Sequence, residues 1–424
     1  MHPFELAKNK MAYESLRTLF HKDSSNDRFE RADSRAESRL NAESTFRLGF
    51  KTPAGELFLA MPRELSVLNE QVLTSERSIS ARLSCLPTLA QRATVRSLVI
   101  DEVVSTNELE GVYSTRRQIN ELLRSDRVTN SNADQRRFRE LAKLYLGLTD
   151  ATQTMPSTPA DIRAIYDRVM DDEPLDEREQ PDGLLFRKGG VEIIGPGSKV
   201  IHEGLYPEQS IIEAIERMLD LAASEDMPAT LSAIVSHFLF EYAHPFYDGN
   251  GRTGRYLLAL YLSRSLSTMT TLSLSRVIAE NRSAYYRSFR EAEHPLNHGE
   301  LTLFVMNLLK NVRTAQEDLD LGLSEKTSLL DEAIERLDRF QTTHDLSDKE
   351  ADIVYMLAQL YLFAAFPEAT QDEVADFIRL GTQRSRAYAK RLEEKGIIIT
   401  PSRRPLKFAL SDSAARELGI AELT

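Results

Sequence analysis

The stretch from residue 244 to residue 255 gathers groups that could act on a nucleotide phosphate chain; it reads His-Pro-Phe-Tyr-Asp-Gly-Asn-Gly-Arg-Thr-Gly-Arg. We expect Gly249 and Gly251 to take positive φ angles and, with Asn250, to direct backbone N–H groups into one anion-binding concavity. The apolar run over residues 256–262 predicts a following helix. The concavity would then lie at a helix N-terminus, where phosphate is favoured.

The charged side chains of this stretch are those that phosphate transfer requires. Arg252 and Arg255 are three residues apart, so both guanidinium groups are expected to project from the first helical turn towards phosphate oxygens. Asp248 offers a hard oxygen ligand of the kind that holds Mg²⁺ together with phosphates and waters. His244 is able to take a hydroxyl proton near neutral pH. Phe246 is expected to be buried scaffold beneath the loop.

The stretch resembles the motif of Fic domains, His-Pro-Phe-x-Asp/Glu-Gly-Asn-Gly-Arg-x-x-Arg, and matches it at every specified position. The resemblance implies a nucleotidyltransferase, a protein adenylyltransferase that moves AMP from ATP to a Ser, Thr or Tyr hydroxyl of a target protein or of itself. It implies that His244 deprotonates the hydroxyl and that Asp248 positions Mg²⁺. Residues 249–251 would cradle the phosphates, while Arg252 and Arg255 would hold the β- and γ-phosphates of the departing pyrophosphate.

A second string, Ser-Thr-Asn-Glu-Leu-Glu-Gly at residues 105–111, resembles the inhibitory motif of the same family, Ser/Thr-x-x-x-Glu-Gly/Asn. Thr106, Glu110 and Gly111 occupy its specified positions. We expect Glu110, on a helix ending at Gly111, to pair with Arg255 and keep its guanidinium away from the γ-phosphate. ATP would then bind with its α-phosphate misplaced for in-line attack by the hydroxyl. A Gly-capped helix with an exposed glutamate is the alternative. Some members use this glutamate to place a water that removes AMP from targets, so de-AMPylation stays open.

A hairpin before the motif is expected where two short β-branched runs flank Gly-Pro-Gly. The resemblance implies that this hairpin is a flap that holds the target by strand pairing, since an exposed strand edge offers unpaired backbone groups. A small structural hairpin that caps the helices is the alternative. The expected docking residues are Gly189, Val191, Ile193 and Ile201.

Two adjacent tyrosines follow the motif. Tyr285 and Tyr286 resemble the tyrosines that flank adenine in Fic enzymes, with ordinary core packing as the alternative. The sequence over residues 293–296, Glu-His-Pro-Leu, departs from the Asn-Glu-Gly-Asp type that is common there. The preference among ATP, other nucleoside triphosphates and CDP-choline therefore stays open.

The composition favours a globular protein of two or three domains, with 424 residues, of which 42% are hydrophobic and 28% charged. A net charge of −12 excludes a general polyanion binder. The single cysteine, Cys85, allows no disulfide within the chain and is expected to be a buried or incidental thiol. Residues 1–20 lack a signal-peptide core, and the longest apolar stretch, residues 353–366, is too short to span a bilayer. We expect a soluble, cytoplasmic protein without a membrane partner.

Helical periodicity dominates the chain, so the expected fold class is all-α with one hairpin, the architecture that the Fic resemblance also implies. Residues 22–45 are polar and are expected to form a loop, and residues 126–134 a linker. Helices are predicted at residues 64–82, 89–108, 114–125, 159–170, 207–224, 228–243, 253–266, 274–292 and 301–321, with another ending near residue 148. The predicted regions are an N-terminal helical region (1–85), a Fic domain with the inhibitory helix (86–322), a linker helix (323–346) and a winged-helix domain (347–424).

The C-terminal region carries the pattern of a winged helix-turn-helix. Short helices over residues 370–378 and 383–395 are predicted on either side of a turn, and they precede β runs at 397–400 and 407–410 that flank a basic turn. Such modules read double-stranded DNA, and they also serve as protein-interaction modules. The rival function is therefore a DNA-binding regulator whose Fic domain senses nucleotide. The DNA-binding candidates are Arg384, Arg386, Lys390 and Arg391 on the recognition helix and Arg403, Arg404 and Lys407 on the wing.

The target protein, the modified residue and the oligomeric state stay open at this point. A homodimer is an assembly that the resemblance makes worth testing, because dimers are common in the family.

Overall fold

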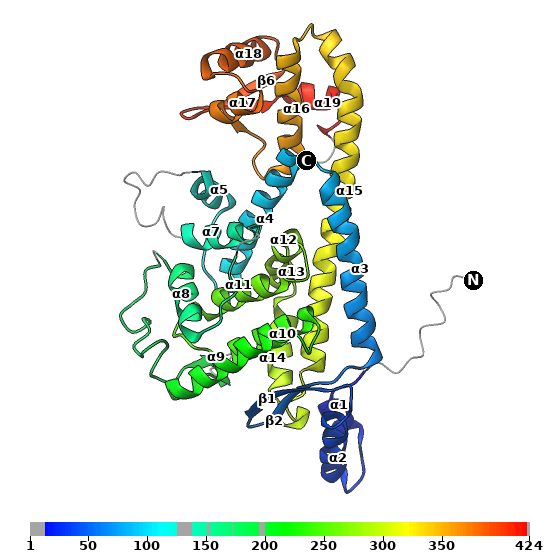
Figure 1. Cartoon of the computed structure of the whole chain (residues 1–424), viewed down its shortest axis with the longest axis vertical. Coiled ribbons are helices and arrows are strands. Elements are labelled where there is room, and N and C mark those ends of the chain that lie inside the picture. Colours follow the sequence, from blue (N-terminus) through cyan, green and yellow to red (C-terminus); the bar gives the residue numbers. More distant parts are fainter. Residues whose placement is uncertain (1–12, 125–137, 151–152, 172, 195–199, 422–424) are drawn as a thin grey trace, which may run out of the picture. The chain divides into compact units, whose positions relative to one another are not determined.

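The computed structural model describes residues 13–124, 138–150, 153–171, 173–194 and 200–421. The chain is mainly helical and divides into two compact units (Figure 1). The first unit comprises Met1–Glu76 and Glu102–Ala315, and the second comprises Arg77–Asp101 and Gln316–Thr424. Three long helices contribute residues to both units: α3 (Arg63–Cys85), α4 (Thr88–Leu109) and α15 (Thr302–Thr343).

The centre of the first unit is a set of packed helices, α9 (Glu208–Ala223), α10 (Ala229–Ala243) and α11 (Asn250–Leu262). Nearly every residue of α10 and α11 is buried, because both helices lie inside the bundle. Helix α10 is mostly apolar, whereas the first turns of α11 bury polar and charged residues, among them Arg252 and Arg255. Helix α8 (Pro159–Val169) packs against α9 and α11. It begins with an N-cap, since the Thr158 hydroxyl accepts from the Asp161 N–H in a capping box.

The helices that follow are α12 (Thr268–Thr271), α13 (Leu274–Glu280) and α14 (Arg282–Ala292). The predicted single helix over residues 274–292 is wrong, because Asn281 ends α13. Its side-chain amide donates to the Val277 carbonyl at 3.1 Å. Asparagine competes for backbone groups in this way and favours helix ends.

The N-terminal part of the first unit differs most from the expectation. Residues 22–45 were expected to be a loop, but they contain α2 (Arg28–Leu40), which follows α1 (Leu16–Lys22). An antiparallel hairpin of β1 (Phe46–Thr52) and β2 (Gly55–Leu59) comes next, in a region that was expected to be helical. Helix α2 buries only Ala32 and Ala36, which explains why its sequence reads as solvated.

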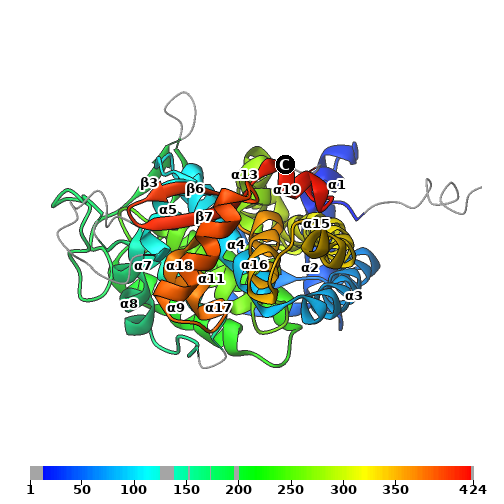
Figure 2. The same ribbon diagram turned by 90° about the horizontal axis from the view of Figure 1, so that it is seen from above.

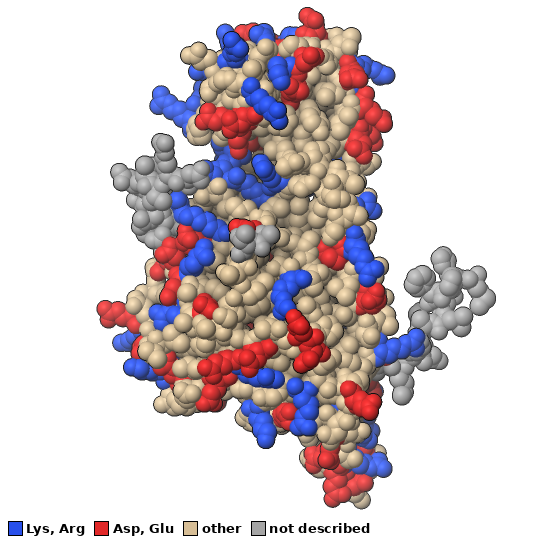
Figure 3. All heavy atoms as spheres, viewed as in Figure 1, with Lys and Arg blue, Asp and Glu red and all other residues tan. Residues whose placement is uncertain are grey.

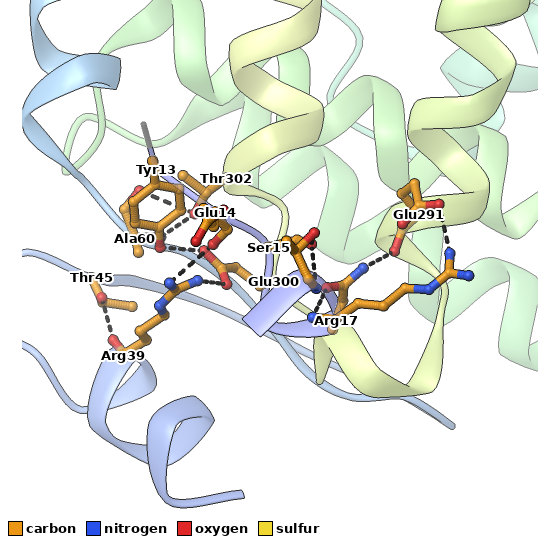
Figure 4. A network of polar contacts seen from close by, with 12 residues as sticks. Tyr13, Glu14, Ser15, Arg17, Arg39, Thr45, Ala60, Glu291, Glu300 and Thr302 are labelled. Carbon is orange, nitrogen blue, oxygen red and sulfur yellow. Dashed lines mark hydrogen bonds and ion pairs between the residues drawn. The ribbon is translucent and has the colours of Figure 1, made fainter. Parts of the chain in front are cut away.

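A polar network holds this N-terminal part to the start of α15 (Figure 4). The Tyr13 hydroxyl donates to the buried carboxylate of Glu300, and Arg39 pairs with the same carboxylate at 2.7 Å. Thr302 connects the network to the residue that follows β2, because the Ala60 N–H donates to its hydroxyl at 3.1 Å. Partners this distant in the sequence leave no local signal, which is why the network was not expected.

The remaining helices of the first unit precede the hairpin that was predicted as a flap. The predicted helices over residues 64–82, 89–108 and 114–125 are confirmed as α3, α4 and α5 (Arg116–Arg124), and α7 spans Arg139–Gly147. The predicted linker over 126–134 lies outside the described residues. Cys85 is exposed, which rules out the buried thiol and leaves the alternative of an incidental one. The hairpin consists of β3 (Glu192–Ile194) and β4 (Val200–Glu203), which pair antiparallel with Glu192 opposite Glu203.

The second unit contains a small three-stranded sheet, with strand order β5-β7-β6, packed with helices. Thr370 is the N-cap of α17 (Gln371–Phe377) and forms a capping box with Glu373. The β6–β7 hairpin lies beside α18 (Figure 2). The elements after α15 are α16 (Asp348–Phe363), β5 (Ala369–Thr370), α17 (Gln371–Phe377), α18 (Thr382–Glu394), β6 (Ile398–Arg403), β7 (Leu406–Leu410) and α19 (Asp412–Glu417).

Three predictions for this region need correction. The separate linker helix over 323–346 is wrong, because α15 runs without a break from Thr302 to Thr343. The turn expected over residues 401–405 is shorter, since β6 continues to Arg403. Strand β5 and helix α19 were not predicted. Among the described helices, none is long and apolar enough to cross a membrane.

Candidate active site

The loop between α10 and α11 carries the candidate site. Its backbone leaves α10 at His244, which has a left-handed conformation with φ 47°, and it enters α11 through Gly249 with φ 78°. A Cβ atom on Gly249 would collide with the sulfur of Met170, so glycine is required there for two reasons. The expectation of a positive φ at Gly251 is wrong, because α11 begins at Asn250 and Gly251 is helical. The anion-binding N–H groups would thus be those of a helical first turn.

Asn250 closes the loop on itself. Its amide nitrogen donates to the Phe246 carbonyl at 2.7 Å, and its amide oxygen accepts from the Phe246 N–H at 2.9 Å. Phe246 is fully buried and stacks on Tyr166 with ring centroids 3.6 Å apart, so its expected scaffold role is confirmed. The Asn250 side chain therefore fixes the loop's shape in this structure.

His244 is arranged as a neutral imidazole. Its Nδ1 lies 3.4 Å from the Glu241 carbonyl oxygen, so Nδ1 carries the hydrogen and Nε2 has a free lone pair. Burial, together with the neighbouring ring of His202 at a centroid distance of 6.0 Å, lowers the pKa of His244 to about 4. At neutral pH the ring is in the form that accepts a proton.

Arg255 is held by the end of α4. Only 2% of its side chain is exposed, and its Nη2 lies 2.6 Å from Glu110 Oε1. Thr106 accepts twice from the same guanidinium, through its hydroxyl at 2.7 Å and its carbonyl at 3.1 Å. Burial alone would raise the pKa of Glu110, but the charge of Arg255 outweighs it and the pKa lies below its ordinary value. The expected pair is therefore present as an ion pair; inhibition itself stays a prediction.

Glu110 also rests directly on the first turn of α11. A Cβ atom on Gly251 would overlap the Glu110 carboxylate. The absence of a side chain at Gly251 is thus what lets the carboxylate approach the helix N-terminus, where negative charge is stabilised. Gly111 has φ 72° and ends α4 as predicted.

The other arginine of the motif, Arg252, is also buried. Arg252 is 1% exposed and pairs through Nη1 with the buried carboxylate of Glu173. Its Nη2 lies 3.7 Å from Asp248 Oδ2, and the Asp248 side chain is 46% exposed. In the described part of the chain no three His, Cys, Asp or Glu residues gather as a metal cage. A single accessible carboxylate fits Mg²⁺ that is held mainly by substrate phosphates and waters.

A cavity of about 760 Å³ opens beside the loop and brings the predicted groups together. This volume is within the usual range for small-molecule sites. His244, Gly251, Arg255 and Glu110 line it, and most of the other lining residues come from the flap and α14. These other lining residues include Ile193, Ile201, His202, Glu241, Arg282, Tyr285, Tyr286, Phe289 and Glu293.

The two tyrosines of α14 differ in their surroundings. Tyr285 is buried, and its hydroxyl donates to His237 Nε2 at 2.8 Å, while His237 Nδ1 faces the Gly254 carbonyl at 3.1 Å. Burial raises the pKa of Tyr285 well above its ordinary value. Tyr286 is half-buried and reaches the Leu109 carbonyl at 3.4 Å. Tyr285 is therefore part of the core as well as of the cavity wall.

The flap residues divide into two pairs. Ile193 and Ile201 line the cavity from β3 and β4. Gly189 and Val191 brace the hairpin instead, since the Gly189 N–H donates to the Tyr247 hydroxyl at 2.8 Å and the Val191 carbonyl accepts from Gly204 at 3.0 Å. Docking of a target by these residues stays a prediction.

Residues 156–262 match the family model described as the Fic/DOC family. The chain contains a Fic domain. The matched segment runs from just before α8 to the end of α11 and includes the flap and the whole loop.

The Fic domain has distant homology to protein adenylyltransferases. The protein adenylyltransferase Fic of Drosophila ananassae is 28% identical over 167 residues, which are 39% of this chain and 30% of that protein. A probable protein adenylyltransferase of Aquifex aeolicus is 44% identical over 108 residues, 26% of this chain and 30% of that protein. The matches thus span under a third of the length of these curated relatives.

Among solved structures, a Fic family protein from Desulfovibrio desulfuricans G20 superposes with a TM-score of 0.49 at 19% identity. The superposition covers 83% of this chain and 97% of that one. Residues 134–508 of Fic-1 from Caenorhabditis elegans give a TM-score of 0.44 at 22% identity, covering 62% of this chain and 74% of that one.

Several residues at the Fic site were not expected from the sequence. His202 on β4 binds Glu293 at 2.8 Å and the Tyr242 carbonyl at 3.1 Å, and it thereby fixes the flap to α10 and α14. Glu241, three residues before His244, places Oε1 in a buried position without a hydrogen-bond partner among the described residues. Glutamate on the apolar α10 was a signal that could have singled it out.

The DNA-binding candidates lie on the second unit. Lys390 lies 3.5 Å from Glu394, and Arg391 pairs with Glu350 at 2.8 Å. Lys407 pairs with Glu368. Figure 3 shows Lys and Arg side chains interspersed with Asp and Glu over the region of α16–α18. Exposed candidates for which the described residues provide no ion pair are Arg384, Arg386, Arg403 and Arg404.

Proposed function

We propose that the Fic domain transfers AMP from ATP to a hydroxyl side chain of a protein, and that Glu110 keeps the resting enzyme slow. The observation that carries the proposal is the single cavity that joins a neutral His244, the N-terminus of α11 and an Arg255 engaged by Glu110. The distant homology to protein adenylyltransferases agrees with it.

The transfer step follows from these groups. His244 Nε2 takes the proton of the attacking hydroxyl as the oxygen approaches the α-phosphorus of ATP. The first-turn N–H groups of α11 stabilise the negative charge that develops on the phosphoryl oxygens. Pyrophosphate departs, and Arg255 neutralises its charge once Glu110 has moved away.

Two further residues support the same reaction. Asp248 is the residue that would hold Mg²⁺, which neutralises phosphate charge when bound. Arg252, which is buried against Glu173 and lies 3.7 Å from Asp248 Oδ2, helps to position the Asp248 carboxylate. The Ile193–Ile201 face of the flap covers the cavity and is where an extended target segment would add to the hairpin.

The test is incorporation of radiolabel from α-labelled ATP with Mg²⁺, using the whole chain. Glu110→Gln and Glu110→Gly release Arg255 and should increase labelling of the protein or of an added target. Glu108→Gln is the matched control, because Glu108 is exposed on the same helix and changes the same charge. His244→Ala in the Glu110→Gly background should reduce labelling by about 10²-fold or more.

The outcomes separate the possibilities. Labelling that rises in both Glu110 variants, stays at the wild-type level in Glu108→Gln and disappears without His244 supports the proposal. Equal labelling in wild type and both Glu110 variants contradicts the inhibitory role. A Glu110 variant that binds ATP yet labels nothing contradicts the transferase.

A DNA-binding regulator is the second candidate, supported by the exposed Arg384 and Arg386 near the start of α18 and the wing arginines Arg403 and Arg404. Fluorescence anisotropy with duplexes from upstream of its own coding sequence tests it. Arg384→Ala and Arg386→Ala should weaken binding by about tenfold each. Arg416→Ala on α19 removes the same charge away from the candidates and should bind as wild type. Equal affinity in all variants would exclude α18 as the DNA contact.

A further inference from the structure

The end of helix α4 is closed by side chains from α14. The last carbonyls of a helix have no intrahelical N–H partner, and they need one from elsewhere. The Asn107 carbonyl accepts from Glu110 and Val112 at 3.0 and 2.9 Å, and the Glu108 carbonyl accepts from Gly111 at 3.0 Å. The next carbonyl, that of Leu109, receives Arg282 Nη2 at 2.9 Å and the Tyr286 hydroxyl at 3.4 Å instead.

Arg282 is well suited to this contact. Its guanidinium lies 5.7 Å from the centre of the Tyr286 ring, so the two donors support each other on the same helix. A cation at a helix C-terminus is also favoured by the helix dipole. Leu109 immediately precedes Glu110, so the position of this carbonyl fixes where the Glu110 side chain starts.

We propose that Arg282 is a positioning residue that keeps Glu110 on Arg255 by binding the Leu109 carbonyl. This proposal rests on the proposed function, since it concerns the inhibition of the enzyme by the Glu110–Arg255 ion pair. Arg282 and Tyr286 line the cavity together with Arg255. Any ligand that draws the Arg282 guanidinium away therefore also loosens the end of α4.

The experiment compares Arg282→Gln with Arg287→Gln. Arg287 is an exposed arginine on the same helix, does not line the cavity and removes the same charge when substituted. In the ATP-labelling assay, Arg282→Gln should raise labelling about threefold to tenfold over wild type, as expected for one lost charge-assisted hydrogen bond at an exposed site. Arg287→Gln should leave it unchanged.

Dependence on Glu110 distinguishes positioning from a general effect. In the Glu110→Gln background, Arg282→Gln should give no further rise in labelling, because the inhibitory Glu110–Arg255 ion pair is already lost. Arg282→Lys, which keeps the charge and one donor, should lie between wild type and Arg282→Gln. A rise of the same size in both backgrounds overturns the proposal.

A second measurement does not depend on activity. Hydrogen–deuterium exchange of a peptide spanning residues 106–113 should be faster in Arg282→Gln than in wild type and Arg287→Gln. If Glu110→Gln shows no labelling, the proposed function fails, and this exchange still decides whether Arg282 holds the helix end. Unchanged exchange in Arg282→Gln overturns the proposal whatever the labelling shows.

Discussion

The residues around Arg255 form a buried group of charges in which each carboxyl has a different role. Glu110 pairs with the guanidinium directly, and Glu102 lies deeper on α4, where it accepts from the Ser275 N–H at 2.9 Å. Glu241 faces the cavity with one oxygen buried and without a hydrogen bond among the described residues. Burial raises the pKa of both Glu102 and Glu241 to about 7.

Glu241 makes the stability of the chain depend on pH. Its pKa rises from an ordinary 4.5 to about 7 in the folded chain, so its stabilising neutral form is complete below pH 4.5 and is lost as the pH approaches 7. Glu241→Gln removes this loss. Measured by urea unfolding, the advantage of Glu241→Gln over wild type should grow by about 2 kcal/mol between pH 5 and pH 7. The exposed Glu216→Gln on α9 should show no such growth, and a constant difference would contradict the buried acid.

The lowered pKa of His244 determines the pH profile that we expect for the reaction. Because its pKa is lowered to about 4, the neutral base is already the main form well below neutral pH. The rate of labelling by Glu110→Gln, measured as kcat/KM for ATP, should therefore be level from about pH 6 to pH 8. An ordinary histidine would give a rise with a midpoint near pH 6.5. Such a midpoint would show that the free enzyme does not hold His244 in the observed buried position.

At the scale of elements, the site lies where the C-terminus of one helix meets the N-terminus of another. The two helices are far apart in the sequence and come together only in the folded chain. Helix α4 ends at Leu109 and directs Glu110 onto the first turn of α11, which begins just after Gly249. The two helix termini complement each other, because the carboxylate meets the positive end of the α11 dipole. The same helix terminus is therefore available to either a carboxylate or a phosphate.

Two glycine-to-alanine substitutions should have opposite effects. Gly249→Ala places a Cβ on a residue with φ 78° and against Met170, so it should destabilise the chain by about 1–3 kcal/mol and reduce labelling. Gly322→Ala lies inside α15 with open space around its Cβ and should stabilise by roughly 0.5–1 kcal/mol. Urea unfolding of both variants checks the signs. Equal changes in the free energy of unfolding in the two variants would mean that helix propensity alone governs both positions.

The sequence predicted elements whose signals are local. The capping boxes at Thr158 and Thr370 and the long apolar runs of α10 and α11 give correct helices, because caps and periodicity act within one turn. The motif also predicted the contact between Glu110 and Arg255 through its resemblance to the family.

Features that depend on distant partners were not predictable. The burial of Arg252 against Glu173 joins segments far apart in the sequence, and the Tyr13–Glu300 contact joins residues from both ends of the first unit. The helical conformation of Gly251 was missed because glycine permits either sign of φ and gives no local indication. Asn281 was predicted as part of a helix because apolar residues three and four positions before and after it keep the helical period.

At the scale of the whole molecule, charge distribution limits what the second unit can bind. The chain carries a net charge of −12, so an association with DNA would depend on a few exposed arginines against a repulsive background. Counterion release makes such binding sensitive to salt, with each phosphate contact adding about 0.9 to the slope of log affinity against log salt.

The expected salt dependence tests this distribution. Arg384→Ala should reduce the magnitude of that slope by about 1, while Arg416→Ala should leave it unchanged. Titrations of a labelled duplex at several salt concentrations provide the slopes. Identical slopes for Arg384→Ala and wild type would show that α18 does not contact the DNA backbone.

The contact of Glu110 with Gly251 has a consequence for how this chain can vary. Any side chain at position 251 would push the carboxylate away, and the same side chain would stand on the helix N-terminus that receives phosphate in the proposed reaction. If the proposed function is correct, a mutation there would abolish transfer in the same step in which it removes the Glu110 restraint. Unregulated activity would have to arise by mutation of α4 or α14, where the two properties are carried by different residues.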